Sequence, residues 1–176
     1  MACLLNTGRK VPCKDSVGGI KAAYFADFGS MGTLQTSAGE VTAFGNTSPT
    51  LDFFKYDVKG NSSLEQTITS SRENGTVFYE QTLNLTLTKL DLATQQELIE
   101  VVKARPHVMV EDYNGNFLLV GAVNGADCSG GTIVTGAAMG DLSGFTLTMA
   151  GQETLPALFV DSTIVAAVTS AAQISA

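Results

Sequence analysis

The stretch TVFYEQTLNLTLTKL, residues 76–90, constrains the fold more than any other part of the chain, because apolar and polar residues alternate from Leu83 to Thr88. Every second position from Leu83 to Leu87 is leucine, and the positions between are Asn or Thr. A period of two gives an extended chain one apolar and one polar face, which is typical of a half-buried strand in an antiparallel sheet. Asn74-Gly75, just before it, favours the positive φ of a two-residue hairpin turn. We therefore expect residues 63–70 to pair with this strand.

Residues 91–105, DLATQQELIEVVKAR, predict the one convincing helix of the chain. Either Asp91 or Thr94 can cap its N-terminus, and Thr94 followed by Glu97 matches a capping box. Pro106 ends the helix, because proline lacks the amide hydrogen that helix propagation needs. We expect the helix to be amphipathic and to lie on a sheet. Its apolar side would carry Leu98, Ile99 and Val102.

Short β-branched or alternating runs fill most of the remaining sequence and are separated by small residues. Asn114-Gly115 gives a second hairpin signal, whereas residues 29–49 form a long connection rich in Gly, Ser and Thr. Near the C-terminal end, Gly140 and Gly144 allow a turn that precedes an alternating strand. The further strands expected cover residues 20–28, 51–58, 107–113, 116–123, 131–138, 143–151 and 157–170.

The predicted fold is mainly β, namely an antiparallel β-sandwich or barrel of about eight strands with one amphipathic α-helix. The 176 residues suffice for one domain with a single core, and no internal repeat or linker divides them. We therefore expect a single structural domain over residues 1–176, with an N-terminal arm over about residues 1–19.

Charge is scarce and unevenly placed along the chain. Charged residues make up 15% of the sequence, against an average of about 25%, which suggests that part of the surface is covered by something other than water. All ten Lys and Arg residues lie at or before Arg105. A surface built from the later, purely acidic part would repel phosphate, which argues against nucleic-acid binding by charge. Its acids are Glu111, Asp112, Asp127, Asp141, Glu153 and Asp161.

Basic residues gather near the N-terminus, at Arg9, Lys10, Lys14 and Lys21. One interpretation is a basic arm that meets an acidic patch on a neighbouring copy. The other is a solvated tail, and the charge pattern is compatible with both.

The most enzyme-like stretch is GADCSGGT, residues 125–132, which superficially resembles the loop around a serine-protease nucleophile. The match breaks because Cys128 separates Asp127 from Ser129. The only histidine, His107, lies directly after a proline at the start of a predicted strand. A hydrolase would need Ser129 near His107, whereas the plain interpretation of the stretch is a glycine-rich turn.

Other residue types that carry chemistry are equally poorly arranged. Glu111 and Asp112 are adjacent in a predicted strand and point to opposite faces, so they cannot act together as an acid/base pair. Three cysteines, Cys3, Cys13 and Cys128, form no C-x-x-C pair, and a single histidine leaves a poor ligand set for zinc. We expect free thiols in a reducing compartment, and no catalytic residue, cofactor or metal.

Neither end of the chain predicts a membrane segment. The first residues contain only a short apolar run, and the basic residues come after it. In a signal peptide the basic residues come before the apolar run. Residues 155–176 are interrupted by Asp161 and by Ser and Thr, and are too polar to span a bilayer. No membrane partner is therefore expected.

From the predicted helix onward the order of elements suggests a family. A helix is followed by a hairpin, PHVMVEDYNGNFLLVG, and then by a small-residue loop and a strand, TGAAMGDLSGFTLTMAGQE. This order resembles tail and tail-tube structural proteins of bacteriophages over roughly the last 85 residues. In the hairpin the resemblance rests on Val108, Val110, Asn114, Gly115, Phe117, Leu119 and Gly121. In the loop and strand it rests on Thr135, Gly136, Gly140, Asp141, Gly144, Phe145, Thr146, Leu147, Thr148, Gly151 and Glu153.

The resemblance implies a virion structural protein without catalytic residues. Proteins of that family have a β-sandwich flanked by a helix and form hexameric rings that stack into a channel for DNA. The implied partners are copies of the chain and other virion tail proteins, while DNA passes through without specific binding. The implied location is the virion, after assembly in the host cytoplasm. Candidates for an acidic surface facing the lumen are Glu111, Asp112, Asp127, Asp141 and Glu153.

Other functions stay open beside the tail tube. Within the structural class, the chain would be a ring, connector or baseplate component. From a different class, a ligand-binding or adhesion β-module would need a concave apolar site.

Overall fold

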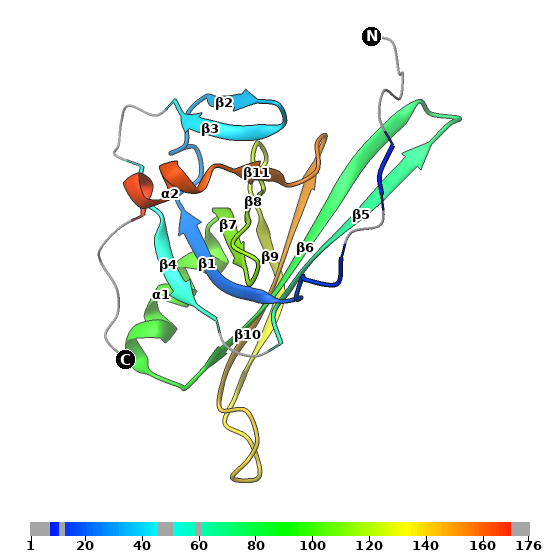
Figure 1. The fold of residues 1–176 in the computed structure, drawn as a ribbon. Coiled ribbons are helices and arrows are strands. Elements are labelled where there is room, and N and C mark those ends of the chain that lie inside the picture. The colour runs from blue at the N-terminus through cyan, green and yellow to red at the C-terminus, as the bar shows by residue number, and fades with distance from the viewer. Residues whose placement is uncertain (1–7, 11–12, 46–50, 59–60, 170–176) are drawn as a thin grey trace.

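The fold consists of two β-sheets with helices against them (Figure 1). The computed structural model describes residues 8–10, 13–45, 51–58 and 61–169. Within these residues the chain forms eleven strands and two helices, α1 (Leu92–Lys103) and α2 (Ser162–Val168). The predicted mainly-β fold is confirmed, and the two sheets do not close into a barrel.

Seven strands form the larger sheet, in the order β2-β3-β11-β8-β7-β1-β4. Their bounds are β1 (Ile20–Ala26), β2 (Leu34–Ser37), β3 (Glu40–Phe44), β4 (Phe54–Asp57), β7 (His107–Asp112), β8 (Phe117–Val120) and β11 (Leu158–Val160). All neighbours pair antiparallel except β11 and β3, which run parallel.

Four longer strands form the second sheet, in the order β5-β6-β10-β9, and every pair is antiparallel. They are β5 (Ser63–Ser71), β6 (Thr76–Thr88), β9 (Asp127–Val134) and β10 (Gly144–Glu153). The predicted hairpin of residues 63–70 with the alternating strand is the β5–β6 pair. In Figure 1 this sheet is a long ribbon whose β5–β6 end reaches beyond the rest of the molecule.

The alternation in β6 separates its two faces as expected. Its three leucines are buried and face a core that lies between the sheets, here called the inter-sheet core. Phe145, Leu147 and Met149 of β10 lie beside them in register, and Leu98 of α1 joins the same core. The seven-stranded sheet contributes Ala23, Phe25, Val108, Val110 and Val120.

The seven-stranded sheet is buried on both faces. Alternate residues of β1, Ala22, Tyr24 and Ala26, point away from the inter-sheet core into a second cluster, here called the outer core. Segments around β2, β3 and α2 cover that face, where Met31, Val41 and Val165 are buried. This double burial explains why β1 is apolar without alternation from Ala22 to Ala26.

The predicted fold had too few strands and one helix too few. The connection over residues 29–49 contains the β2–β3 hairpin, whose turn places Ala38 at φ 54° and Gly39 at φ 89°. Ala at positive φ is not a turn signal, so the sequence hides this hairpin. Residues 157–170 begin with the short strand β11 and continue as the second helix, α2. There the Asp161 carboxylate caps the helix by accepting from the Thr163 amide at 2.8 Å.

The helix α1 begins as predicted but packs with a narrower apolar side. Asp91 is the N-cap, since its carboxylate accepts from the Thr94 amide at 3.0 Å. Leu98 is buried, whereas Ile99 and Val102 are 45% and 47% exposed. The predicted apolar side is therefore only partly covered within the described chain.

Candidate self-association surface

One face of the four-stranded sheet carries neutral polar side chains along three neighbouring strands. The register sets Thr86 of β6 beside Thr146 of β10, and Thr146 beside Thr132 of β9. One step further, Asn84 lies beside Thr148. We call this surface the threonine face; it consists of Thr82, Asn84, Thr86, Thr132, Thr146 and Thr148.

Side chains of the threonine face hydrogen-bond to one another across the strands. The hydroxyls of Thr132 and Thr146 lie 2.7 Å apart, and the Thr148 hydroxyl donates to Asn84 Oδ1 at 2.9 Å. Thr132 is exposed, and the other members of the face are half-buried. In the sequence the alternating threonines indicate only the polar side of a strand.

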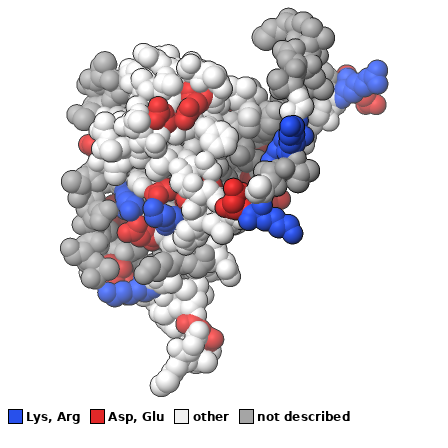
Figure 2. Space-filling view, in the orientation of Figure 1, with Lys and Arg blue, Asp and Glu red and all other residues white. Residues whose placement is uncertain are grey.

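None of the four strands of this sheet contains Lys or Arg. Its acids are Glu65 on β5, Glu80 on β6, Asp127 at the start of β9, and the buried Glu153. Figure 2 shows the general scarcity of charge, with wide areas of uncharged surface between the acidic and basic groups. A surface of this kind offers phosphate no cation to bind.

Both edges of the four-stranded sheet are open within the described residues. The outermost strands are β5 on one side and β9 on the other. Apolar side chains are exposed at each edge: Ile68 of β5 is 64% exposed, and Ile133 of β9 is 63% exposed. Edge strands present unpaired N–H and C=O groups that another chain can pair with.

An apolar groove of about 460 Å³ runs beside the β9 edge, between that strand and α1. The exposed Ile99 and Val102 lie in it, which accounts for the uncovered part of the helix's apolar side. It is lined mainly by Leu98, Ile99, Val102, Ile133, Phe145 and Leu147. An open strand edge and an uncovered apolar strip thus lie side by side.

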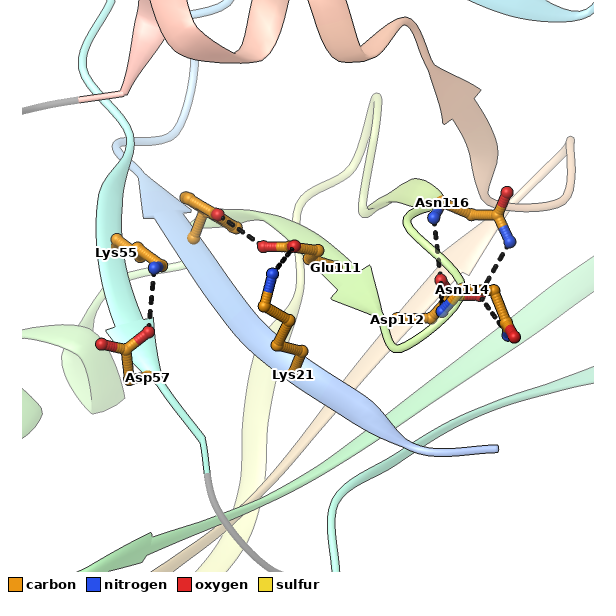
Figure 3. A network of polar contacts seen from close by, with 8 residues as sticks. Lys21, Lys55, Asp57, Glu111, Asp112, Asn114 and Asn116 are labelled. Atoms are coloured by element: carbon orange, nitrogen blue, oxygen red, sulfur yellow. Dashed lines mark hydrogen bonds and ion pairs between the residues drawn. The ribbon is translucent and has the colours of Figure 1, made fainter. Parts of the chain in front are cut away.

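The five acids predicted for a lumen surface do not lie on one surface. Glu111 and Glu153 are buried, so their assignment to an exposed acidic surface was wrong. Glu111 forms an ion pair with Lys21 and accepts from the Tyr24 hydroxyl at 2.8 Å (Figure 3). Glu153 accepts from the amides of Val123 and Asn124 at 2.9 and 2.7 Å. Each carboxylate is buried because it has these specific donors.

Asp112, Asp127 and Asp141 reach the surface at separate places. Burial alone would raise the pKa of Asp112, but hydrogen bonds from Asn116 and Asn114 outweigh it and lower that pKa. Asp141 accepts from the amides of Ala138 and Ala137, which lower its pKa. Asp127 lies opposite Ala150, at the other end of the β9–β10 hairpin from Asp141, roughly 20 Å away at the usual rise per residue.

The hypothetical hydrolase pair is held in other interactions. His107 is buried; its Nδ1 lies 2.6 Å from the Gly121 carbonyl, and its Nε2 accepts from the Gly29 amide at 3.0 Å. The Ser129 hydroxyl donates to the Thr148 carbonyl at 3.2 Å, in the four-stranded sheet. Both ring nitrogens of His107 are occupied, so the geometry gives the serine no base.

The described part of the chain contains no group of three His, Cys, Asp or Glu residues placed to hold a metal. Cys13 and Cys128 are free thiols, while Cys3 lies outside the described residues. Neither helix described is long and apolar enough to cross a membrane. Comparisons with protein-family models, with curated proteins and with solved structures find no match.

Proposed function

We propose that this protein is a self-assembling virion structural protein, a tail-tube subunit whose four-stranded sheets join edge to edge around a channel. The observation that carries the proposal is the sheet itself. It has one buried face, one polar face without a cation, and two edges that are open within the described residues.

The two edges favour head-to-tail association. A subunit that uses β9 to pair with β5 of its neighbour keeps its own β5 free for a third copy, so the contact repeats. Such heterologous contacts form a ring when the rotation between copies closes, and an open fibre when it does not. The apolar groove beside β9 would be covered in the same step, since Ile68 and Val77 are exposed near the opposite edge.

The threonine face suits the inner wall of a tube that carries DNA. Its hydroxyl and amide groups can be hydrated. Because the four strands contain no Lys or Arg, the face has no strong binding site for phosphate. DNA would therefore pass without specific binding. Of the acids that the sequence suggested for the lumen, Asp127 lies on this face by its register, and Glu65 and Glu80 lie on it as well, so the wall carries some negative charge and no cation.

The resemblance to phage tail-tube proteins supports the same function and adds details to it. On that basis we propose a hexameric ring, stacking into a tube, contacts with other virion tail proteins, and location in the virion after assembly in the host cytoplasm. A ring, connector or baseplate role would use the same edges.

Sedimentation velocity and negative-stain microscopy of the purified protein test the proposal directly. The expected result is a species several times the 18.4 kDa of the single chain, seen as hollow rings or short tubes. A chain that stays monomeric at millimolar concentration would contradict it. A monomer that takes up small apolar probes in the α1–β9 groove would instead favour a ligand-binding module.

A further inference from the structure

The chain before β1 forms an exposed arm with a fixed root. Every described residue of the arm, 8–10 and 13–19, is exposed. At the root, the Val17 amide donates to Asn114 Oδ1 at 2.9 Å, and Asn114 Nδ2 donates to the Val17 carbonyl at 2.7 Å. This paired contact ties the arm to the β7–β8 turn.

The turn that holds the arm is itself rigid. The Asp112 carboxylate accepts from the amides of Asn114 and Asn116, both at 2.8 Å, and from Asn116 Nδ2 at 2.8 Å (Figure 3). Asn114 is thereby oriented toward Val17. The arm leaves the molecule in a defined direction, along the side where β5 and β6 extend (Figure 1).

The described part of the arm is basic. It carries Arg9, Lys10 and Lys14 against the single acid Asp15. The nine residues from 8 to 16, immediately before the root, would reach about 30 Å if fully extended. A chain of this length can enter a neighbouring subunit.

On the opposite side of the molecule, a groove of about 690 Å³ separates α1 from β1 and β4. Five carboxylates and two lysines line it, which gives it the charge opposite to that of the arm. Burial raises the pKa of Tyr56 on β4, and the negative charge of Glu97, on the facing helix α1, raises it further. The acids are Asp27, Asp57, Asp91, Glu97 and Glu100.

Not all of these acids are free for a ligand. Asp57 pairs with Lys55 at 2.9 Å (Figure 3). Asp91 caps α1. Glu100 also has a partner, Lys103 at 3.5 Å, but both side chains are exposed and such a pair is weak enough for another cation to replace it. Asp27 and Glu97 line the groove without an ion pair to another described residue, beside exposed Phe54.

A subunit's own arm points away from its own groove. The arm joins the first residue of β1, whereas the groove is lined by the last residues of that strand and by Asp27 beyond it. The strand alone separates them by roughly 20 Å, and the Asn114 contact sets the arm's course.

We propose that the basic arm of one copy docks in the acidic groove between α1 and β4 of a neighbouring copy. Arg9, Lys10 and Lys14 then lie against Asp27, Glu97 and Glu100. This rests on the proposed self-assembly, and it identifies a contact that the sheet edges do not make.

The native thiol of Cys13, which is exposed in the arm, allows a direct test. In a full-length chain with Cys3→Ser and Cys128→Ser, Glu97→Cys places a second thiol in the groove. Mild oxidation should give a ladder of disulfide-linked oligomers on a non-reducing gel. Glu73→Cys, on the exposed turn between β5 and β6, is the matched control and should give far less product.

Charge reversal tests the same contact without a covalent bond. Glu97→Lys with Glu100→Lys should weaken association roughly tenfold at low salt, because exposed ion pairs are individually weak and screened. Adding Arg9→Glu, Lys10→Glu and Lys14→Glu to the same chain should restore it. Loss without rescue would contradict the pairing.

The outcomes separate this inference from the proposed function. Rings without the Cys13 cross-link overturn the arm contact alone. Cross-linked chains without rings or tubes support the arm contact and contradict the tail tube, whereas an uncross-linked monomer overturns both. A cross-link within one chain, recognised by its monomer mass, shows that the arm binds its own groove and also overturns the inference.

Discussion

At the scale of single residues, a few buried polar groups fix the connection between β8 and β9 to both sheets. The Gly121 amide donates to Gln81 Oε1 at 2.9 Å, and the Gly121 carbonyl oxygen lies 2.6 Å from His107 Nδ1. Gly121 itself has φ 64°, and a Cβ there would lie 2.4 Å from the Gly125 carbonyl carbon. Glycine is therefore required, both for its backbone conformation and for the close approach.

His107 should make stability depend on pH below neutrality. Burial is the largest cause that lowers its pKa, and its Nε2 already accepts an amide hydrogen. In the unfolded chain the His107 imidazole has a pKa near 6.5, whereas in the folded chain its pKa is lower, so it is protonated only at lower pH. The contribution of neutral His107 to the free energy of unfolding is therefore complete above pH 6.5. It is lost as the pH falls from 6.5 toward the folded pKa, by at most about 1.4 kcal/mol per pH unit.

Urea unfolding between pH 7.5 and 5 measures this loss. Because His107 is the only histidine, His107→Asn, whose amide can still donate to Gly121, should remove most of the slope. An unchanged slope in the variant would assign the effect to the carboxylates.

Residue-level contacts are where sequence reasoning reached least far. Glu111 and Glu153 look like surface acids, yet their partners Lys21 and Val123 are 90 and 30 residues away. Local sequence contains no signal for such pairs. The cap of α1 at Asp91, by contrast, involves a residue three positions away and was among the predicted alternatives.

At the scale of elements, predictability follows how local the determinants are. The period of β6 and the turn signal at Gly75 act within a few residues, and both the strand and its hairpin with β5 were predicted correctly. The predicted two-residue turn was wrong, because the loop has four residues, 72–75, and Gly75 alone of the predicted pair has positive φ. Strand β11 is three residues long, and its partners β3 and β8 come from distant parts of the chain. Strand β2 is four residues long and pairs with the next strand, β3, but their turn has Ala38 at positive φ and so gives no turn signal. For the assembly surface, the alternating threonines were visible, but the two open edges follow only from strand order.

The β9 edge should be sensitive to charge. Ile133→Lys places a cation where a neighbouring strand would pack, and it leaves the fold intact because the side chain is 63% exposed. Edge lysines block strand pairing in natural sheets. Assembly measured by sedimentation should shift toward monomer by tenfold or more in concentration, about 1.4 kcal/mol per tenfold.

Val123→Lys is the control for this variant, since Val123 is similarly exposed but lies in the connection before β9. Equal effects of the two lysines would show that added charge, and not the strand edge, governs association.

At the scale of the whole molecule, two cores share one sheet. The inter-sheet core and the outer core lie on opposite faces of the same seven-stranded sheet. Loss of either core would expose one face of that sheet to water and so weaken the support of the other core. We expect the subunit to unfold in one cooperative transition, as single domains usually do.

Leu85→Ala tests this cooperativity. Leu85 is 1% exposed at the centre of the inter-sheet core, so its truncation should lower the free energy of unfolding by about 2–5 kcal/mol. Guanidinium unfolding, followed by circular dichroism and by tyrosine fluorescence, should show the whole curve moving. Ile68→Ala, at an exposed strand position, should change it by about 0.5 kcal/mol or less. Two separate transitions would mean that the cores unfold independently.

The position of β11 gives the order of chain synthesis a structural role. This strand, residues Leu158–Val160, lies between β3 and β8 and joins the β2–β3 hairpin to the rest of the sheet. During translation the hairpin emerges more than a hundred residues before the strand that attaches it. Until then β3 and β8 are open edges, so a chain interrupted before Leu158 has two additional sites for mispairing. The seven-stranded sheet is thus completed only when nearly all of this sequence has been made.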